Sequence, residues 1–381
     1  MCRLLVITAA ALALAGCGGG DGRDEFRVGV VEDSTRLPDS AGARERVQAV
    51  RDAGFDALRI TSIWAPGQTS ADQAELDVLR NVAQASEALG VRLFIAVYHA
   101  GSATTPRTDE QRGEFASYVA SLARELPVRD FIIGNEPNLN RFWMPQFGPG
   151  GEDVAAQDYG LLLAESYDAL KAVSDEVNVL GGALAPRGSD RPELPRDTHS
   201  PTAFLRDLGA FYRQSGREEP LMDMLAYHPY ETNSSVPPGN PHPESTTMTL
   251  GDYDRLRTLL GEAFEGTAQE GEDLPILYTE FGVESRIPPD KQELYEETEF
   301  ASVKPVDEET QAAHYTTAIR LAYCQETVIG ILLFHVFDEL DLRGWQSGIR
   351  YVDDTPKASY EPVKEAALAA REGDVDCSEE G

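Results

Sequence analysis

Two short motifs place glutamates where they could act as a pair. Glu136 lies in IGNEP (133–137), and Glu280 lies in YTEFG (278–282). Each follows a run of apolar residues that predicts a buried strand, so each carboxyl group comes at a strand end. Strand ends and helix starts also favour acidic residues for structural reasons alone. Two carboxylates that face each other can instead do chemistry, one as a proton donor and one as a nucleophile or base.

Other polar and aromatic residues also lie at or just beyond the ends of predicted strands. A single histidine or arginine in such a place more often makes structural hydrogen bonds than it takes part in catalysis. Exposed aromatic rings suit the apolar faces of sugar rings and of other flat ligands. The candidate substrate-binding residues are Arg59, Trp64, His99, Asn135, Trp143, His228, Tyr230, Phe334 and Trp345.

The elements that must position these residues alternate regularly along the chain. Apolar, β-branched runs predict eight strands, and amphipathic stretches such as 40–54, 72–90 and 153–174 predict helices between them. Gly54 and Gly90 lie where helix C-caps are expected. The predicted strands are 26–32, 57–64, 92–99, 130–135, 177–185, 224–230, 275–282 and 328–337.

Strands that alternate with helices and are apolar on both faces predict an α/β fold, a single-domain (β/α)8 TIM barrel over residues 26–371. A doubly wound open sheet is the alternative, but no glycine-rich phosphate motif follows the first strand. Long connections at 231–252, 283–306 and 338–358 follow strands six, seven and eight. Functional residues of such barrels lie on the strand-to-helix side, so the candidate residues should share one mouth.

In this barrel the two glutamates would face each other from strands four and seven, the arrangement that glycoside hydrolysis needs. Their motifs resemble those of the clan of retaining (β/α)8 glycoside hydrolases, which includes cellulases and xylosidase-like enzymes. The resemblance implies that Glu136 is the acid/base and Glu280 the nucleophile. Retention requires carboxyl groups about 5 to 5.5 Å apart.

The resemblance also implies roles for the neighbouring residues. Asn135 would bind the sugar 2-hydroxyl, Arg59 would support the nucleophile and Tyr230 would orient it. His99 and His228 would line the sugar site. Many members of the clan end strand eight with a tryptophan that floors this site, whereas the present chain reads LLFHVFDE at 332–339, so either Phe334 or Trp345 would replace it.

The composition limits the partners. A formal net charge of −32 over 381 residues argues against nucleic acid and anionic membrane surfaces. We therefore expect an oligo- or polysaccharide substrate that is neutral, unless a local basic patch overrules the net charge, and the β-linkage rests on the resemblance alone. We expect no cofactor, no metal site and a monomer. The alternatives are a carbohydrate-binding barrel that has lost turnover and a metal-dependent barrel hydrolase, which the lack of a His-x-His strand end disfavours.

The N-terminus predicts export. Arg3 precedes an apolar run over 4–15, and Leu14-Ala15-Gly16-Cys17 resembles a bacterial lipobox, which implies a signal peptide over 1–16 and a lipid on Cys17. An ordinary secretory signal is the alternative. Residues 17–25 would be a tether that holds the protein at the extracellular face of the cell membrane, the only membrane contact that we expect.

Cys2 would leave with the signal peptide and Cys17 would carry the lipid, so two cysteines remain as an even pair. Cys324 and Cys377 should form a disulfide in an oxidising compartment. Closing a loop of that length contributes roughly 4 kcal/mol in the chain-entropy model. Residues 372–381 are expected to be a C-terminal tail.

Overall fold

Eight parallel strands close into one barrel. The computed structural model describes residues 26–192 and 196–378. The strands pair in sequence order, and β8 returns to pair with β1. This confirms the predicted (β/α)8 barrel and excludes the doubly wound sheet. The strands are β1 (Arg27–Val31), β2 (Ala57–Trp64), β3 (Arg92–His99), β4 (Asp130–Ile133), β5 (Asn178–Leu184), β6 (Met224–Tyr227), β7 (Ile276–Phe281) and β8 (Val328–Phe334).

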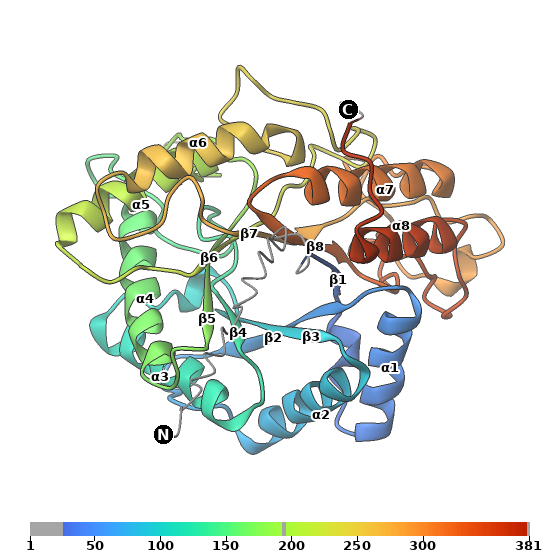
Figure 1. Cartoon of the computed structure of the whole chain (residues 1–381), viewed down its shortest axis with the longest axis horizontal. Helices are drawn as coiled ribbons and strands as arrows, with labels where there is room; N and C mark the ends of the chain where they lie inside the picture. Colours follow the sequence, from blue (N-terminus) through green and yellow to red (C-terminus); the bar gives the residue numbers. More distant parts are fainter. Residues whose placement is uncertain (1–25, 193–195, 379–381) are drawn as a thin grey trace, which may run out of the picture.

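The helices surround the strands as an outer layer (Figure 1). Most begin at a side chain that accepts a backbone N–H, as Asp72 accepts from Glu75 before α2. Gly90 ends α2 with a left-handed φ of 65°, as its place in the sequence predicted. The helices are α1 (Ser40–Asp52), α2 (Gln73–Leu89), α3 (Asp109–Glu125), α4 (Val154–Lys171), α5 (Pro201–Ser215), α6 (Tyr253–Phe264), α7 (Glu308–Cys324) and α8 (Tyr360–Glu372).

Two apolar layers hold the barrel together. A small cluster that includes Ala57, Phe94 and Leu277 fills the barrel interior. A much larger cluster, which includes Leu58 and Ile60, packs between strands and helices. Successive residues of a strand point to opposite faces, so the strands are buried on both sides and read as continuous apolar runs.

Two strands change this alternation where they approach the mouth. The register of β7 against β8 shifts between Tyr278 and Phe281, and that of β5 against β6 shifts between Gly182 and Leu184. An irregularity of this kind turns the residues beyond it to the other face. Leu277 and Glu280, three positions apart, therefore both face the interior.

A disulfide joins Cys324 at the end of α7 to Cys377 beyond α8, the pair that the sequence predicted. Helix α8 runs to Glu372, one residue past the predicted end of the barrel. The predicted signal peptide over 1–16, the lipid site Cys17 and the rest of the tether lie outside the described residues. Among the residues that are described, no helix combines the length and the apolar character that a membrane span requires.

Candidate active site

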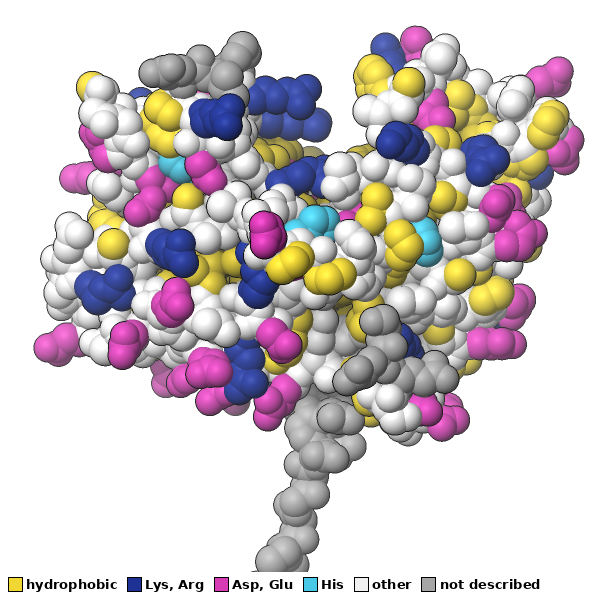
Figure 2. All heavy atoms as spheres, turned by 90° about the horizontal axis from the view of Figure 1, so that it is seen from above, with side chains coloured by type: hydrophobic (Ala, Val, Ile, Leu, Met, Phe, Trp, Pro, Cys, Tyr) yellow, Lys and Arg dark blue, Asp and Glu magenta, His cyan; other side chains and the backbone are white. Residues whose placement is uncertain are grey.

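An open cavity of about 1140 Å³ lies where the strands end. Both Glu136 and Glu280 line it, together with Arg59, Asn135 and Tyr230. In Figure 2 the upper surface of the molecule is hollowed between two raised parts, with Lys and Arg side chains along the hollow. The barrel therefore brings the predicted glutamate pair into one accessible space.

Glu280 is held from two sides. The Nη1 group of Arg59 donates to Glu280 Oε1 at 2.5 Å and to the carbonyl oxygen of Thr279 at 3.1 Å. Its Nη2 group donates to Asn135 Oδ1 at 3.2 Å. The hydroxyl of Tyr230 donates to Glu280 Oε2 at 3.1 Å. Both carboxylate oxygens thus have a donor, and the arginine links the glutamate to Asn135.

These contacts set the ionisation of Glu280. Burial by itself raises the pKa of this carboxyl group, but the interactions with His228 and Arg59 and the hydrogen bonds from Arg59 and Tyr230 outweigh it. The pKa of Glu280 is therefore lowered below its ordinary value, so the group is an anion at neutral pH. An ionised, fixed carboxylate is what a nucleophile requires.

Glu136 lies on an unusual backbone. Its φ is 42°, in the left-handed region, and its N–H donates to the carbonyl oxygen of Ala183 at 2.8 Å. Gly134, two residues earlier, has φ 85°, and a Cβ there would lie 2.9 Å from the ring of Tyr159. Non-glycine residues persist in this region only where the surroundings hold them, often at functional sites. The chain here is thus shaped to aim one carboxyl group into the cavity.

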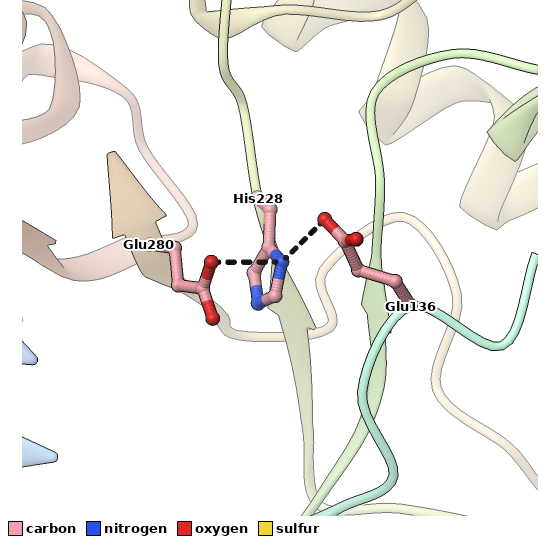
Figure 3. Close-up of side chains that lie close together, drawn as sticks. All are labelled: Glu136, His228 and Glu280. Carbon is pink, nitrogen blue, oxygen red and sulfur yellow. Dashed lines mark hydrogen bonds and ion pairs between the residues drawn. The ribbon is translucent and has the colours of Figure 1, made fainter. Parts of the chain in front are cut away.

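His228 lies between the two carboxylates (Figure 3). Its Nδ1 atom is 3.2 Å from Glu136 Oε1 and 3.6 Å from Glu280 Oε2. The histidine side chain is completely buried. One atom of each of the three groups lies within 4.8 Å of the others. The two carboxyl groups are therefore close neighbours with a shared partner.

Spacing alone would let these three groups hold a cation. However, both oxygens of Glu280 already accept hydrogen bonds, from Arg59 and from Tyr230. A cation bound there would also meet the guanidinium charge of Arg59. The donor set suits an ion pair better than a metal.

Three aromatic rings form one wall of the cavity. The ring of Trp345 lies 5.3 Å from that of Tyr230 and 5.0 Å from that of Phe334, centroid to centroid. All three residues line the cavity. The sequence left open whether Phe334 or Trp345 takes the place of a strand-eight tryptophan, and the structure brings both together beside Glu280.

Four candidate residues do not line the cavity: His228, which is buried and contacts both glutamates as described above, and Trp64, Trp143 and His99. Trp64 is fully buried among the helices, with its ring 5.5 Å from that of Phe115 in α3. Trp143 is buried between His99 and Tyr159, at ring distances of 5.5 and 5.8 Å. His99 bonds through Nδ1 to the Gly101 carbonyl oxygen at 2.9 Å. The assignment of Trp64, Trp143 and His99 to substrate contact was therefore wrong, and all three are packing residues.

Strand alternation explains two of these errors. Arg59 and Thr61 of β2 line the cavity, so Trp64, at an odd spacing from both, faces the helices. In β3, Tyr98 lines the cavity and the next residue, His99, points the other way. Because every second residue of a strand faces the same side, counting along β2 from Arg59 would have excluded Trp64 from the predicted site and included Thr61.

Several lining residues were absent from the predicted set. Tyr98 and Thr61 lie at the alternating strand positions that face the barrel interior, as just described. Asp33 follows β1 and accepts the N–H of Thr61 at 2.7 Å, a position that its place after a strand could have signalled. Arg141 and Arg187 come from the connections after β4 and β5, where no periodic pattern marks them.

No protein-family model and no curated protein matches the sequence. Solved structures do resemble the chain. A monomeric β-xylosidase from Caulobacter crescentus CB15 is 17% identical, with a TM-score of 0.56 over 89% of this chain and 67% of that one. The GH5_18 protein from Streptomyces cattleya, solved with GlcNAc, is 16% identical, with a TM-score of 0.60 over 91% and 80%.

A third structure, the β-glycosidase BGL167, is 16% identical, with a TM-score of 0.59 over 94% of this chain and 99% of that one. At these identities the likeness shows the fold. The chain therefore has the (β/α)8 barrel that these glycoside hydrolases share, and its chemistry must be argued from its own residues.

Proposed function

We propose that the protein is a retaining glycosidase that cleaves β-linked glycans by double displacement. One observation carries the proposal: two carboxyl groups with atoms within 4.8 Å of each other face one cavity in unlike surroundings. Retaining enzymes hold their carboxyl groups about 5 to 5.5 Å apart, whereas inverting enzymes leave room for a water at roughly 6.5 to 9.5 Å. The short separation favours retention.

The unlike surroundings of the two glutamates support the roles that we propose for them. The ionised Oε atom of Glu280 attacks the anomeric carbon, the glycosidic C–O bond breaks, and the leaving oxygen takes the proton of Glu136. Glu136, now a carboxylate, then accepts a proton from a water molecule that attacks the same carbon. This second step breaks the bond to Glu280 and regenerates both groups.

The neighbouring residues support these steps. Arg59 and Tyr230 hold Glu280 in one orientation, and Arg59 fixes the amide of Asn135 beside it. We propose that this amide binds a sugar hydroxyl next to the reacting carbon. The rings of Trp345 and Phe334 offer apolar surface to a sugar ring.

A panel of aryl β-glycosides tests the proposal. We expect turnover of at least one of them, and the first sugar product, followed by NMR, should keep the β configuration. Release of the α anomer first would contradict double displacement. No turnover, together with sugar binding that Glu280→Gln leaves unchanged, would instead favour a carbohydrate-binding barrel.

We also propose export with a lipid on Cys17. The disulfide between Cys324 and Cys377 supports an oxidising compartment. Mass spectrometry of the mature protein should find a lipid-modified N-terminal cysteine, and Cys17→Ser should release the protein from the membrane fraction. An unmodified N-terminus produced by cleavage elsewhere would favour an ordinary secretory signal.

A further inference from the structure

The cavity wall beside Glu136 is basic, although the whole chain carries a net charge of −32. We call it the arginine wall. It is built by the connections that follow β4 and β5, and apart from Glu136 no carboxylate in it lines the cavity. Its lining residues are Leu139, Asn140, Arg141, Phe142, Ala185, Pro186, Arg187, Gly188, Ser189, Arg196 and Thr198.

Arg187 and Arg141 carry charges that no described residue neutralises by an ion pair. Arg187 Nη1 donates to the main-chain oxygen of Glu231 at 2.8 Å. The guanidinium of Arg141 lies 5.3 Å from the ring centroid of Phe142. Neither arginine makes an ion pair with any residue in the described ranges. The arginine wall thus offers guanidinium groups that are free to bind an anion.

Two acidic side chains of the same connections, Asp190 and Asp197, accept hydrogen bonds from other residues. Asp190 accepts the N–H of Ser200 at 2.6 Å, and Asp197 accepts the amide of Asn140 at 2.9 Å. Burial lowers the pKa of Arg187, although its interactions with Glu136 and Glu231 oppose this. The charge of Arg187 is therefore partly withdrawn from water and incompletely compensated, which favours an anionic ligand.

Two other arginines of the cavity behave differently. Arg59 is paired with Glu280, as described above. Arg343, on the opposite side, pairs with Asp341 at 2.7 Å and with Glu297 at 3.5 Å. Open guanidinium groups are thus a property of the arginine wall and not of the cavity as a whole.

We propose that the substrate carries an anionic substituent, a carboxylate or a sulfate, on its leaving-group portion, and that Arg187 and Arg141 bind it. This inference rests on the proposed function, because Glu136 donates its proton to the leaving oxygen and the arginine wall adjoins Glu136. Guanidinium forks match carboxylate and sulfate geometry with paired N–H donors. The net charge of −32 predicted a neutral glycan, and the arginine wall is the local basic patch that overrules it.

Matched pairs of ligands test the inference by isothermal titration calorimetry. Oligosaccharides that contain hexuronic acid are compared with the same oligosaccharides after reduction of the carboxylates to alcohols. Sulfated oligosaccharides are compared with their desulfated forms. All titrations use the Glu280→Gln background, so that no ligand is consumed. We expect one acidic member to bind about ten-fold more tightly than its neutral partner, with a preference that declines as salt rises.

Added arginine variants locate the effect. Arg187→Gln should reduce the preference to about two-fold, and the double variant with Arg141→Gln should abolish it. Arg343→Gln is the matched control, because its charge is already paired, and it should leave the preference unchanged. Three results would each overturn the inference. Both neutral partners could bind as tightly as the acidic ligands or more tightly, neither acidic ligand could bind, or the preference could survive in the double variant. If the wild type turns over no glycoside but the acidic preference persists, the hydrolase proposal fails and the anion site stands.

Discussion

The two glutamates of the cavity have opposite surroundings. Glu280 has a donor on each carboxylate oxygen, from Arg59 and Tyr230, and lies on the side where the neighbouring charges are paired. Glu136 has one ring nitrogen, from His228, as its side-chain partner and lies beside the arginine wall. Glu280 is therefore held by two side-chain donors, whereas Glu136 has a single side-chain partner.

This difference matches the two tasks of the double displacement that we propose. The nucleophile must remain an anion in one orientation, which a buried ion pair provides. The acid/base must gain and lose a proton in each cycle, so a permanent ion pair would hinder it. The arginine wall adjoins Glu136, so in the proposed mechanism its unpaired guanidinium groups would face the leaving group.

The largest expected effect is the loss of the nucleophile. Glu280→Gln keeps the size of the side chain but removes the charge that attacks the anomeric carbon. We expect turnover to fall on the order of 10⁶-fold, the scale at which nucleophile loss affects covalent catalysis. Steady-state assays with an aryl β-glycoside measure it, and a loss below about ten-fold would disprove the role.

Glu136→Gln should cost less and depend on the leaving group. General acid catalysis contributes about 10²- to 10⁴-fold, and the need for a proton falls when the leaving group is a stable anion. We expect the full loss with alkyl glycosides and a much smaller one for the first step with dinitrophenyl glycosides. Burst kinetics separate the two steps, and equal losses with both leaving groups would assign Glu136 another role.

The buried pair should matter more for stability than the open arginine. Arg59→Met leaves Glu280 without its ion pair, and breaking one partner of a buried pair costs about 3 to 5 kcal/mol. Arg187→Gln is the matched control, and because Arg187 has no ion pair to lose among the described residues, it should change the free energy of unfolding by roughly 0.5 kcal/mol or less. Urea denaturation measures the free energy of unfolding of both variants. Similar losses would contradict the contrast between the paired Arg59 and the unpaired Arg187.

A pH effect is expected on the Glu280 side. Burial raises the pKa of Glu284, in the connection after β7, to about 7. The folded state thus keeps this proton when the unfolded chain has lost it, so stability contributed by Glu284 declines as pH rises from about 4.5 to 7. Glu284→Gln should remove this decline in the free energy of unfolding, which amounts to about 3 kcal/mol at most. Melting temperatures at pH 4 should agree between variant and wild type and should diverge at pH 8.

The smallest expected effect is that of a chelator. Both carboxylate oxygens of Glu280 already accept hydrogen bonds, from Arg59 and from Tyr230, so removal of divalent cations should leave turnover unchanged. Assays after dialysis against EDTA measure this. A loss that added Zn²⁺ or Mn²⁺ restores would show that Glu136, His228 and Glu280 bind a metal.

The sequence by itself determined the barrel and its glutamate pair. Apolar runs and amphipathic stretches reveal strands and helices because burial on both faces is a local, periodic property. Strand ends of a barrel converge, so Glu136, Glu280, Arg59 and Tyr230 could be expected in one mouth. The same alternation, applied within β2, would have kept Trp64 out of the predicted site.

Only the tertiary structure decided which side chains meet. The irregularity in β7 turns Glu280 inward, and the left-handed backbone at Glu136 is held by contacts from β5. The arginine wall joins two connections that are about fifty residues apart, and nothing in either segment predicts their contact. Non-local packing sets such geometry, because its energy depends on neighbours that no local pattern specifies. The composition indicated an acidic protein, and the fold placed unpaired positive charge beside Glu136, the proposed proton donor.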